Sequence, residues 1–517
     1  MEEQQELPQG WVWTTISQVG KAVTGNTPST ARPEFYGGHI PFFKPGDLDS
    51  GYAISEAETK LTEAGAASAR ILPSHSILVT CIGATIGKTG FSTVAGATNQ
   101  QINALVPDAA VVVPQFAYFG IISPLLFRLI FDKASSTTLP ILNKSKFEAL
   151  AFPLPPLPEQ RRIVAKLEEL FSKLDAGVAA VRRTQALLKR YRQSVLHAAV
   201  TGELTRAWRE AHHAPAETGA ALLERIRAER WAQWETAQVA KRGGQLPLGD
   251  GWKSKYVEPE APDTSELPEL PEGWVWTNLE ALSWDSGYGT SEKCSYESTG
   301  LPILRIPNVV KGQLSFENIK RAGADAKINP LETVAPGDLL IIRTNGSKPL
   351  IGRAAVVFDF LSQPTHFASY LIRFRLVNEQ MLLRWISATW NSFDNRKWIE
   401  EHAASSAGQH NISLSTLNNL PIPLPPLDEQ AEIVTTVEAR LSVLDNLEQT
   451  LTDELKRAER LRQSILHRAF TGRLVPQDAT DEPAAALLAP LREAPAAPAK
   501  AKAGRGRKES SQIDFSF

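Results

Sequence analysis

The sequence predicts an α+β protein in which two mixed α/β globular domains are joined by two long, antiparallel coiled-coil helices in a pseudo-symmetric repeat. Three observations lead to this prediction. The segment Leu7–Thr14 (LPQGWVWT) returns as Leu270–Thr277 (LPEGWVWT). The segment Pro153–Gln160 (PLPPLPEQ) returns as Pro423–Gln430 (PLPPLDEQ), and a long stretch with apolar residues at every seventh position follows each copy. Solenoid repeats run at roughly 20 to 50 residues, so a repeat this long duplicates a whole domain and a whole helix.

Composition bounds the class of protein. The 517 residues are enough for two to four domains, and a formal net charge of −2 gives no global basic field of the kind that often marks a nucleic-acid binder. The two cysteines, Cys81 and Cys294, lie in non-equivalent places and suggest neither a disulfide framework nor a zinc site. The polar N-terminus is unlike a signal peptide, and no apolar run reaches the ~20 residues that span a bilayer. We therefore expect a cytoplasmic protein without a membrane partner, in which any contact with DNA comes from local patches.

The chain divides into six predicted segments. In the first domain, strand-like stretches at His39–Lys44 and Ser76–Ile82 are separated by Gly-rich turns. The last 25 or so residues are rich in Ala, Pro and Lys, a composition typical of disorder. In order, the segments are a first globular domain (1–152), a first long helix (153–202), a linker with a short amphipathic helix (203–262), a second globular domain (263–422), a second long helix (423–474), and a short helix with the Ala/Pro/Lys-rich tail (475–517).

Both long helices carry a heptad pattern, which favours a coiled coil. The first stripe is Leu167, Leu174, Val181, Leu188 and Val195, with Ile163, Leu170 and Tyr191 on the partner seam. The second is Val437, Leu444, Leu451, Ala458 and Ile465, with Ile433, Leu447 and Leu461 beside it. A helix of about 43 residues is about 64 Å long and cannot fold back into its own domain. The simplest way to bury both stripes is to pack the two helices against each other.

These paired motifs resemble those of the DNA-specificity subunits of type I restriction–modification enzymes. The match includes the helix ends Arg192–His197 and Arg462–His467 and the Thr-Gly-x-Leu exits at Thr201–Leu204 and Thr471–Leu474. The resemblance implies two target-recognition domains, each reading one half of a split, asymmetric site in double-stranded DNA. It also implies that the helices are a ruler between the domains and a dock for two adenine methyltransferase subunits, which restriction/translocase subunits join. The tail after Arg492 is not covered by the resemblance.

Signatures of catalysis are absent from the sequence. It contains no Gly-x-Gly-x-x-Gly motif, no metal-ligand spacing of Cys and His, and no Asn/Asp-Pro-Pro-(Tyr/Phe) motif of adenine methyltransferases. Gly83–Gly90 superficially resembles a phosphate loop, but only three residues separate Gly83 from Gly87, and the second copy at Asn345–Arg353 lacks the pattern. We expect a non-catalytic chain without a cofactor, with S-adenosylmethionine, ATP and Mg²⁺ bound only by partner subunits of the complex that the resemblance implies.

Several polar residues follow apolar strands in both halves and are candidates for DNA contact. Lys88 and Arg353 each follow Ile-Gly, where glycine lets the backbone approach a phosphate and the cation neutralises it; the alternative is a plain hairpin with a solvated charge. Asn99–Gln101 could pair with adenine through its amides, or form a polar turn, and Thr365, His366 and Ser369 occupy the corresponding stretch. The stretches Ser135–Thr138 and Ser405–His410 precede the helix starts in both halves, and the second, with Gly408–Asn411, is either a donor-rich loop or a helix cap. The candidate residues are Lys44, Asp47, Thr85, Lys88, Asn99, Gln100, Gln101 and Lys144 in the first domain, and Arg305, Asn308, Asn345, Lys348, Arg353, His366, Gln409 and His410 in the second.

Other features allow two interpretations each. The first long helix has nine Lys or Arg against four acidic residues, which fits either contact with the DNA spacer or a solvated coiled-coil face. Tryptophans 11, 13, 274 and 276 alternate in apolar strands, which favours core packing over base stacking. Two rival functions stay open at this point: a free-standing DNA-modifying enzyme with duplicated domains, and a coiled-coil adaptor that does not bind DNA.

Overall fold

A computed structural model describes residues 6–135, 139–212, 216–245, 249, 251–328, 333–377, 379–406 and 408–493. It divides into two compact units, unit 1 (1–181 and 453–517) and unit 2 (182–452). Each unit therefore contains one globular domain and half of each long helix. The predicted disordered tail, from residue 494 onward, lies outside the described residues.

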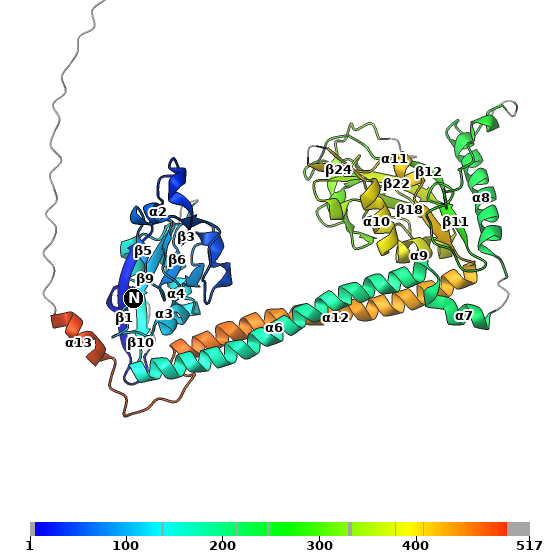
Figure 1. The fold of residues 1–517 in the computed structure, drawn as a ribbon. Helices are drawn as coiled ribbons and strands as arrows, with labels where there is room; N and C mark the ends of the chain where they lie inside the picture. The colour runs from blue at the N-terminus through cyan, green and yellow to red at the C-terminus, as the bar shows by residue number, and fades with distance from the viewer. Residues whose placement is uncertain are drawn as a thin grey trace, which may run out of the picture. The chain divides into compact units, whose positions relative to one another are not determined.

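Unit 1 contains two four-stranded sheets, whose strands follow the orders β2–β9–β6–β7 and β4–β3–β8–β5 (Figure 1). Their bounds are β2 (Gly20–Thr24), β9 (Ile102–Pro107), β6 (Ile77–Thr80), β7 (Thr89–Phe91), β4 (Lys60–Leu61), β3 (Tyr36–Phe43), β8 (Gly96–Thr98) and β5 (Ile71–Leu72). All neighbours are antiparallel except β3 and β8. The β6 strand is buried along its whole length because apolar Ile77, Leu78 and Val79 face packed side chains on both sides.

Short helices complete the domain of unit 1. They are α1 (Ile16–Val19), α2 (Glu63–Ala67), α3 (Pro114–Ile121), α4 (Pro124–Lys133) and α5 (Lys144–Glu148). The α4 helix starts where the Ser123 side chain accepts a hydrogen bond from the Leu126 N–H, and Pro124 occupies its first turn. Among the described residues no single helix is long and apolar enough to cross a membrane. The helices α3 and α4, whose axes differ by 61°, reach that length and apolar composition only when they are taken together.

Unit 2 repeats the strand order of the first sheet with different side chains, while its second sheet matches that of unit 1 in three strands and differs in the fourth. Its sheets have the orders β12–β22–β18–β20 and β13–β17–β14–β21. Their strands are β12 (Ser283–Tyr288), β22 (Leu371–Leu376), β18 (Asp338–Ile342), β20 (Ala354–Val356), β13 (Cys294–Ser295), β17 (Lys320–Ala322), β14 (Pro302–Leu304) and β21 (His366–Phe367). The helices are α9 (Gln380–Thr389), α10 (Phe393–His402) and α11 (Leu414–Asn418). A hairpin of β15 (Val309–Val310) and β16 (Gln313–Leu314), and a sheet of β19 (Thr344–Asn345), β24 (Gln409–Asn411) and β23 (Ala404–Ser406), complete the unit.

The repeated motifs form the same frame in each unit. The opening strand pairs antiparallel with the closing strand: β1 (Val12–Thr15) with β10 (Ala151–Leu154), and β11 (Val275–Asn278) with β25 (Pro421–Leu424). The indole N–H of Trp11 donates to Glu159 at 3.0 Å, and that of Trp274 donates to Glu429 at 2.7 Å. Both tryptophans are buried, as the sequence predicts, whereas Trp13 and Trp276 of the same strands are only half-buried. The Trp and Glu of the two repeated motifs thus join each opening strand to the start of a long helix.

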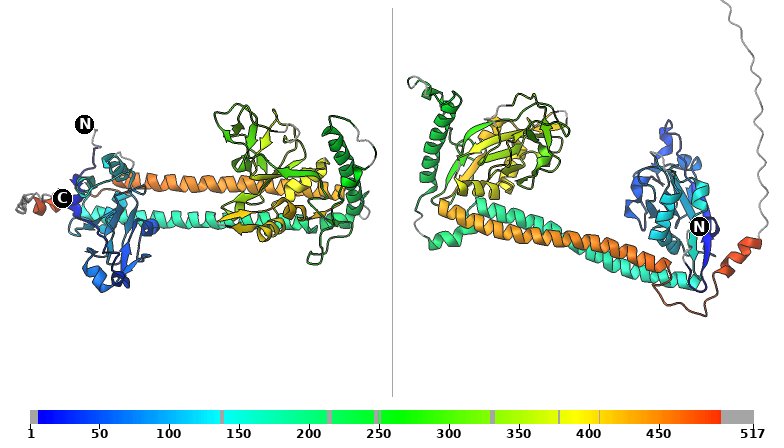
Figure 2. Two further views of the ribbon diagram at one scale, coloured as in Figure 1. Left: turned by 90° about the horizontal axis from the view of Figure 1, so that it is seen from above. Right: turned by 180° about the vertical axis from the view of Figure 1, so that it is seen from behind.

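The two long helices are α6 (Leu157–Val200) and α12 (Leu427–Phe470), and they pair antiparallel within each unit (Figure 2). In unit 1, Asp175 of α6 forms an ion pair with Arg462 of α12. In unit 2, Arg192 of α6 forms one with Asp445 of α12. The predicted pairing is therefore confirmed.

The seam differs in part from the heptad prediction. Tyr191, Leu447 and Leu461 are 48%, 45% and 50% exposed, so their assignment to the seam was wrong. Phe171, which is 6% exposed, lies one position after Leu170 and packs in the unit 1 core. The seam follows alternating steps of three and four residues, and apolar residues one position off it remain in solvent.

A glycine follows each long helix and lies close to the Leu-Pro-x-Gly-Trp motif that opens a domain. Gly202, at φ 72°, follows α6, and a Cβ there would lie 2.4 Å from Pro271. Gly472, at φ 68°, follows α12, and a Cβ there would lie 2.2 Å from Pro8. The Thr-Gly-x-Leu exits therefore need glycine for both conformation and close approach.

After each exit a helix docks in the same way. The helix α8 (Gly219–Ala240) begins where the Gly219 N–H donates to Gly273 O at 2.7 Å. The helix α13 (Ala485–Glu493) follows Ala484, whose N–H donates to Gly10 O at 2.9 Å. The apolar pair Leu222 and Leu223 of α8 packs in unit 2, and Leu487 and Leu488 of α13 pack in unit 1.

Candidate nucleic-acid interface

The turn that carries the predicted cation has the same backbone geometry in both units. The N–H of Gly87 donates to Thr80 O and that of Gly352 donates to Ile342 O, both at 2.8 Å. Lys88 Nζ lies 2.6 Å from Asp49 Oδ1, so this cation already has a carboxylate partner. Arg353 is exposed, and its Nε donates to Pro349 O at 3.2 Å. Arg353 is therefore the more open of the two cations toward a phosphate.

Lys44 and Arg305 also occupy equivalent positions, each before a short 3-10 helix, η2 (Pro45–Ser50) and η5 (Ile306–Asn308). The backbone N–H of Lys44 donates to Asp47 at 2.7 Å, and that of Arg305 donates to Asn308 at 2.9 Å. Asp47 also accepts from the Glu58 N–H at 2.9 Å. Asn308 is 0% exposed, so it has no surface to offer a base, and its assignment as a DNA contact is corrected to a loop-holding role.

The Asn99–Gln101 stretch is a polar turn after β8. Asn99 Nδ2 donates to Gln101 Oε1 at 2.9 Å, and exposed Gln100 accepts from Thr27 Oγ1 at 2.6 Å. The amides therefore hold one another, and Gln100 keeps its NH₂ group at the surface.

The counterpart of this turn in unit 2 differs from the predicted one for Thr365 and His366, whereas Ser369 does align with Gln100. Asn99 N–H donates to Phe43 O, and Ala368 N–H donates to Leu304 O, which aligns Asn99 with Ala368. His366 instead pairs with Ile303 on β14 and is 1% exposed. His366 is thus a core residue, and its assignment as a DNA contact was wrong because the alignment was shifted by the divergent sequence.

In unit 2, two predicted stretches far apart in the sequence lie side by side. Strand β24 pairs with both β19 and β23, so that His410 lies opposite Asn345 on one side and Ser405 on the other. Gln409 and Lys348 are exposed beside them. This sheet gathers amide, imidazole, hydroxyl and ammonium groups, the donor and acceptor types that read base edges and phosphates.

Unit 1 places the corresponding stretches together with fewer polar groups. Ile82 forms an isolated bridge with Ile141, and the Gly83 N–H donates to Pro140 O at 3.0 Å. Thr85 is exposed in the adjacent turn. Lys144 begins α5, with its Nζ 3.5 Å from Glu148. Of the predicted Ser135–Thr138 loop, residues 136–138 lie outside the described part of the chain.

One exposed group was missed in the sequence. The Arg343 guanidinium lies 4.6 Å from the ring centroid of Tyr288, and its Nε donates to Asn411 at 3.2 Å. Tyr288 and Tyr370 are 46% and 54% exposed. No local motif joins these residues, because they come from three separate segments that only the fold brings together: the end of β12, the residue after β18 and the residue before β22.

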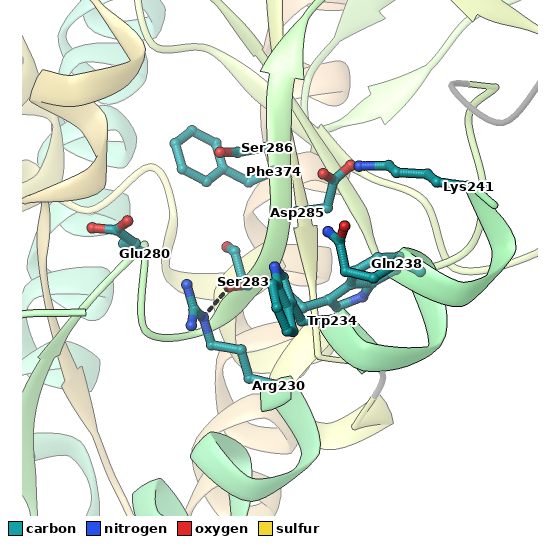
Figure 3. A pocket seen from close by; sticks show the side chains of 11 residues that line it. Arg230, Trp234, Gln238, Lys241, Glu280, Ser283, Asp285, Ser286 and Phe374 are labelled. Atoms are coloured by element: carbon teal, nitrogen blue, oxygen red, sulfur yellow. Dashed lines mark hydrogen bonds between the residues drawn. The ribbon is translucent and has the colours of Figure 1, made fainter. Parts of the chain in front are cut away.

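A pocket between α8 and the edge strand β12 was also unforeseen (Figure 3). Its volume is about 240 Å³, and Trp234 and Gln238 of α8, with Lys241 directly after the helix, face Asp285 of β12 across it. Arg230 Nε donates to Ser283 O at 2.8 Å, which fixes α8 to this strand. The ring of Trp234 stacks on that of Trp252 with their centroids 5.6 Å apart. The aromatic residues thus hold α8 against the linker segment that follows it.

The basic residues of α6 fall into two groups. Some are paired: Arg162 with Asp481 at 2.7 Å, Lys173 with Glu169 at 2.6 Å, and Arg192 with Asp445. Others are exposed in the middle of the helix: Arg182, Arg183, Lys189 and Arg190. This second group, together with exposed Arg161 near the start of the helix, is open to a DNA backbone.

The architecture defines a class of protein: a duplicated chain with two similar α/β domains, each presenting its own polar loops, built on two shared antiparallel helices. Comparison with known proteins gives the family. The chain belongs to the family of type I restriction modification DNA specificity domains, whose family model matches residues 8–179 and 333–457.

Known specificity subunits match most of this chain at modest sequence identity. The chain is 26% identical to the type I restriction enzyme StySPI specificity subunit of Salmonella potsdam, with 92% of each chain covered. It is 26% identical to the EcoKI specificity subunit of Escherichia coli K12, with 97% of this chain and 98% of that one covered. A solved structure on complex assembly and conformational transition of the type I R-M system contains a chain with a TM-score of 0.60, at 19% identity, covering 91% of this chain and 100% of that one. The predicted fold class and family are confirmed.

Proposed function

We propose that this chain is the DNA-recognition subunit of a type I restriction–modification complex and that each domain reads one half of a bipartite, asymmetric site. The observation that carries the proposal is the contrast within the duplication. The frame repeats closely, with Trp11 on Glu159 and Trp274 on Glu429. The loops at the ends of matched strands differ, as Asn99 against Ala368 shows. A common frame with different loops suits two readers of different sequences at a fixed separation.

The proposed contacts in unit 2 centre on the β19–β24–β23 sheet. Asn345, Gln409 and His410 offer hydrogen bonds to base edges, and Lys348 and Arg353 offer charge to phosphates. In unit 1 the proposed contacts are the exposed or half-buried polar residues of matched turns: Lys44, Thr85, Lys88, Gln100, Gln101 and Lys144. Asp47 and Asn99 act by holding these turns, and Arg305 takes the place of Lys44 in unit 2.

The long helices are proposed to act as spacer and scaffold. Each is 44 residues long, which gives about 66 Å of helix. Two adenine methyltransferase subunits would bind this scaffold, and restriction/translocase subunits would join them in the cytoplasm. The chemistry, with S-adenosylmethionine, ATP and Mg²⁺, would belong to those subunits, because adenine methylation needs a pocket for a flipped base.

The test is isotope transfer from S-adenosylmethionine to DNA, followed by sequencing of methylated sites. The chain alone should transfer nothing, and the chain with its methyltransferase subunits should methylate one bipartite sequence. Transfer by the chain alone would establish the rival free-standing enzyme. A complex that forms but shows no salt-dependent DNA binding would establish the rival adaptor.

A further inference from the structure

An apolar groove in unit 2 lies between the domain and α12. Its volume is about 470 Å³. Val437 and Leu441 of α12, Ala388 of α9 and Val357 after β20 line it, with Phe358 and Phe360 at its rim. Phe360 is 87% exposed and Phe358 is 44% exposed. Exposed aromatic residues around an apolar groove mark an interaction surface when they cluster in this way.

In unit 1, side chains of the domain itself occupy the position that corresponds to this groove. The ring of Tyr52 stacks between Phe91, at a centroid distance of 5.4 Å, and Phe119, at 5.3 Å. Phe119 packs edge-on against Phe171 of α6 at 5.7 Å. The Tyr52 hydroxyl donates to Glu168 of α6 at 2.6 Å. Burial, and then this contact with Glu168, raise the pKa of Tyr52 far above its ordinary value, which keeps the hydroxyl a donor.

The duplication shows which side chains unit 2 lacks. Ser123 and Ser392 both cap the helix that follows, so Tyr118 and Phe119 correspond to Ser387 and Ala388. By the repeat of α6 in α12, Phe171 corresponds to Leu441 and Glu168 to Glu438. Side chains without rings thus replace the aromatic ones. Counted from the equivalent residues Lys44 and Arg305, Tyr52 corresponds to Gln313, which lines the groove together with Leu314.

The rim of the groove is acidic. The Glu438 side chain is 51% exposed and pairs with Arg384 at 2.5 Å. Asp359 is exposed at the rim. An occupant that reproduces the Tyr52 arrangement would place an aromatic ring on Ala388 and Leu441 and a donor on Glu438. Basic residues on either side of that ring would complement Asp359 and Glu438.

We propose that this groove is a docking site for an aromatic side chain of one methyltransferase subunit, so that the two methyltransferase positions on the scaffold are not equivalent. This inference rests on the proposed function, which supplies the partner. Buried aromatic anchors commonly dominate the energy of protein interfaces. In unit 1, Tyr52 already occupies the corresponding position, so only the methyltransferase subunit bound on unit 2 can insert an aromatic side chain there. The two subunits should then bind with different affinities.

The experiment measures binding of the purified cognate methyltransferase subunit to the full chain by calorimetry, with stoichiometry from native mass spectrometry. Phe360→Ser should weaken one of the two binding steps at least fivefold and leave the other unchanged. Phe393→Ser is the matched control, since Phe393 is 56% exposed but does not line the groove, and it should change neither step. The double variant Ser387→Tyr, Ala388→Phe should refill the groove and weaken the same step as Phe360→Ser.

Each outcome decides between explanations. Wild-type affinities in both groove variants, with wild-type melting temperatures, would overturn the inference while leaving the proposed function intact. Two equal binding steps in the wild type would also overturn it. A wild-type dimer that Phe360→Ser dissociates would show that a second copy of this chain occupies the groove. Failure of every variant and the wild type to bind methyltransferase would instead contradict the proposed function.

Discussion

The central sheets of units 1 and 2 have the same topology but different interiors. In unit 2, fully buried Asp338 on β18 accepts two hydrogen bonds from Arg375 on β22, at 2.6 and 2.9 Å. Strand pairings align Asp338 with Ser76, and Arg375 with Val106, in unit 1. Buried ion pairs rarely add net stability, but they penalise any arrangement that leaves one partner alone. The duplication thus preserves strand order and register while the interior composition of the sheet changes.

The frame itself also differs at one point. Glu429 accepts from Trp274 at 2.7 Å, from Thr205 at 2.6 Å, and from Arg209. Glu159, also 2% exposed, accepts from Trp11, while its other oxygen is buried with no hydrogen-bond partner among the described residues. The same motif residue is therefore well satisfied in unit 2 and only half satisfied in unit 1.

The largest expected effect tests the sheet comparison. Asp338→Ala should destabilise unit 2 by about 4 kcal/mol, because it leaves the guanidinium of Arg375 buried without its carboxylate. The matched change Ser76→Ala removes one hydrogen bond, to Pro73 O at 2.7 Å, and should cost about 1 kcal/mol in unit 1. Hydrogen exchange during urea unfolding measures both, assigned to peptides of each unit. Equal losses of unfolding free energy in the two variants would show that breaking the buried pair of Asp338 and Arg375 costs no more than removing one hydrogen bond.

A smaller effect tests the frame comparison. Glu429→Ala should destabilise unit 2 by about 3 kcal/mol, since three donors lose their acceptor, two of them on buried residues. Glu159→Gln should change unit 1 by less than about 1 kcal/mol, because Gln keeps an acceptor for Trp11 and removes a buried charge. The same exchange measurement applies. A large loss in Glu159→Gln would mean that its carboxylate is paired in solution.

The frame comparison also predicts a pH dependence. Burial raises the pKa of Glu159 above its ordinary value of 4.5. The folded unit 1 then holds a proton that the unfolded chain releases, so its stability should fall as pH rises from 4.5 through the raised pKa. Calorimetry across this window should show the fall in wild type and not in Glu159→Gln. Identical profiles for the two proteins would contradict the assignment.

The smallest effect concerns the two equivalent cations. Arg353→Gln should weaken DNA binding of the assembled complex about fivefold. The slope of log affinity against log salt concentration should fall by about one, because one phosphate contact is lost. Lys88→Gln should do less, because Lys88 Nζ already lies 2.6 Å from Asp49. Fluorescence anisotropy at several salt concentrations, on a duplex with the methylated site, measures both. A larger effect at Lys88 would mean that the ion pair opens to meet DNA.

The parts of the fold that repeat were predictable from the sequence, and most of the rest was not. The repeated motifs predict the strand frame and both long helices, and the heptad pattern predicts that the helices pair. Trp11 and Glu159, for example, belong to two of these motifs and form a hydrogen bond in the structure. The seam assignment failed at Tyr191 and Leu461, because an apolar residue beside a heptad position looks the same in sequence as one on it. His366 was misassigned because no shared residue anchors the alignment inside the divergent domains. The contact of Arg343 with Tyr288 depends on strand neighbours that no local pattern records.

The central claim is that each domain reads its own half-site. It is tested most directly by replacing residues 15–150, which keeps the repeated frame, with the corresponding domain of another family member. The methylated sequence of cells carrying the complex is then determined. We predict that one half of the site changes while the other half and the spacer length stay the same. A change in both halves would contradict the account, since it would mean that the two domains do not read DNA independently.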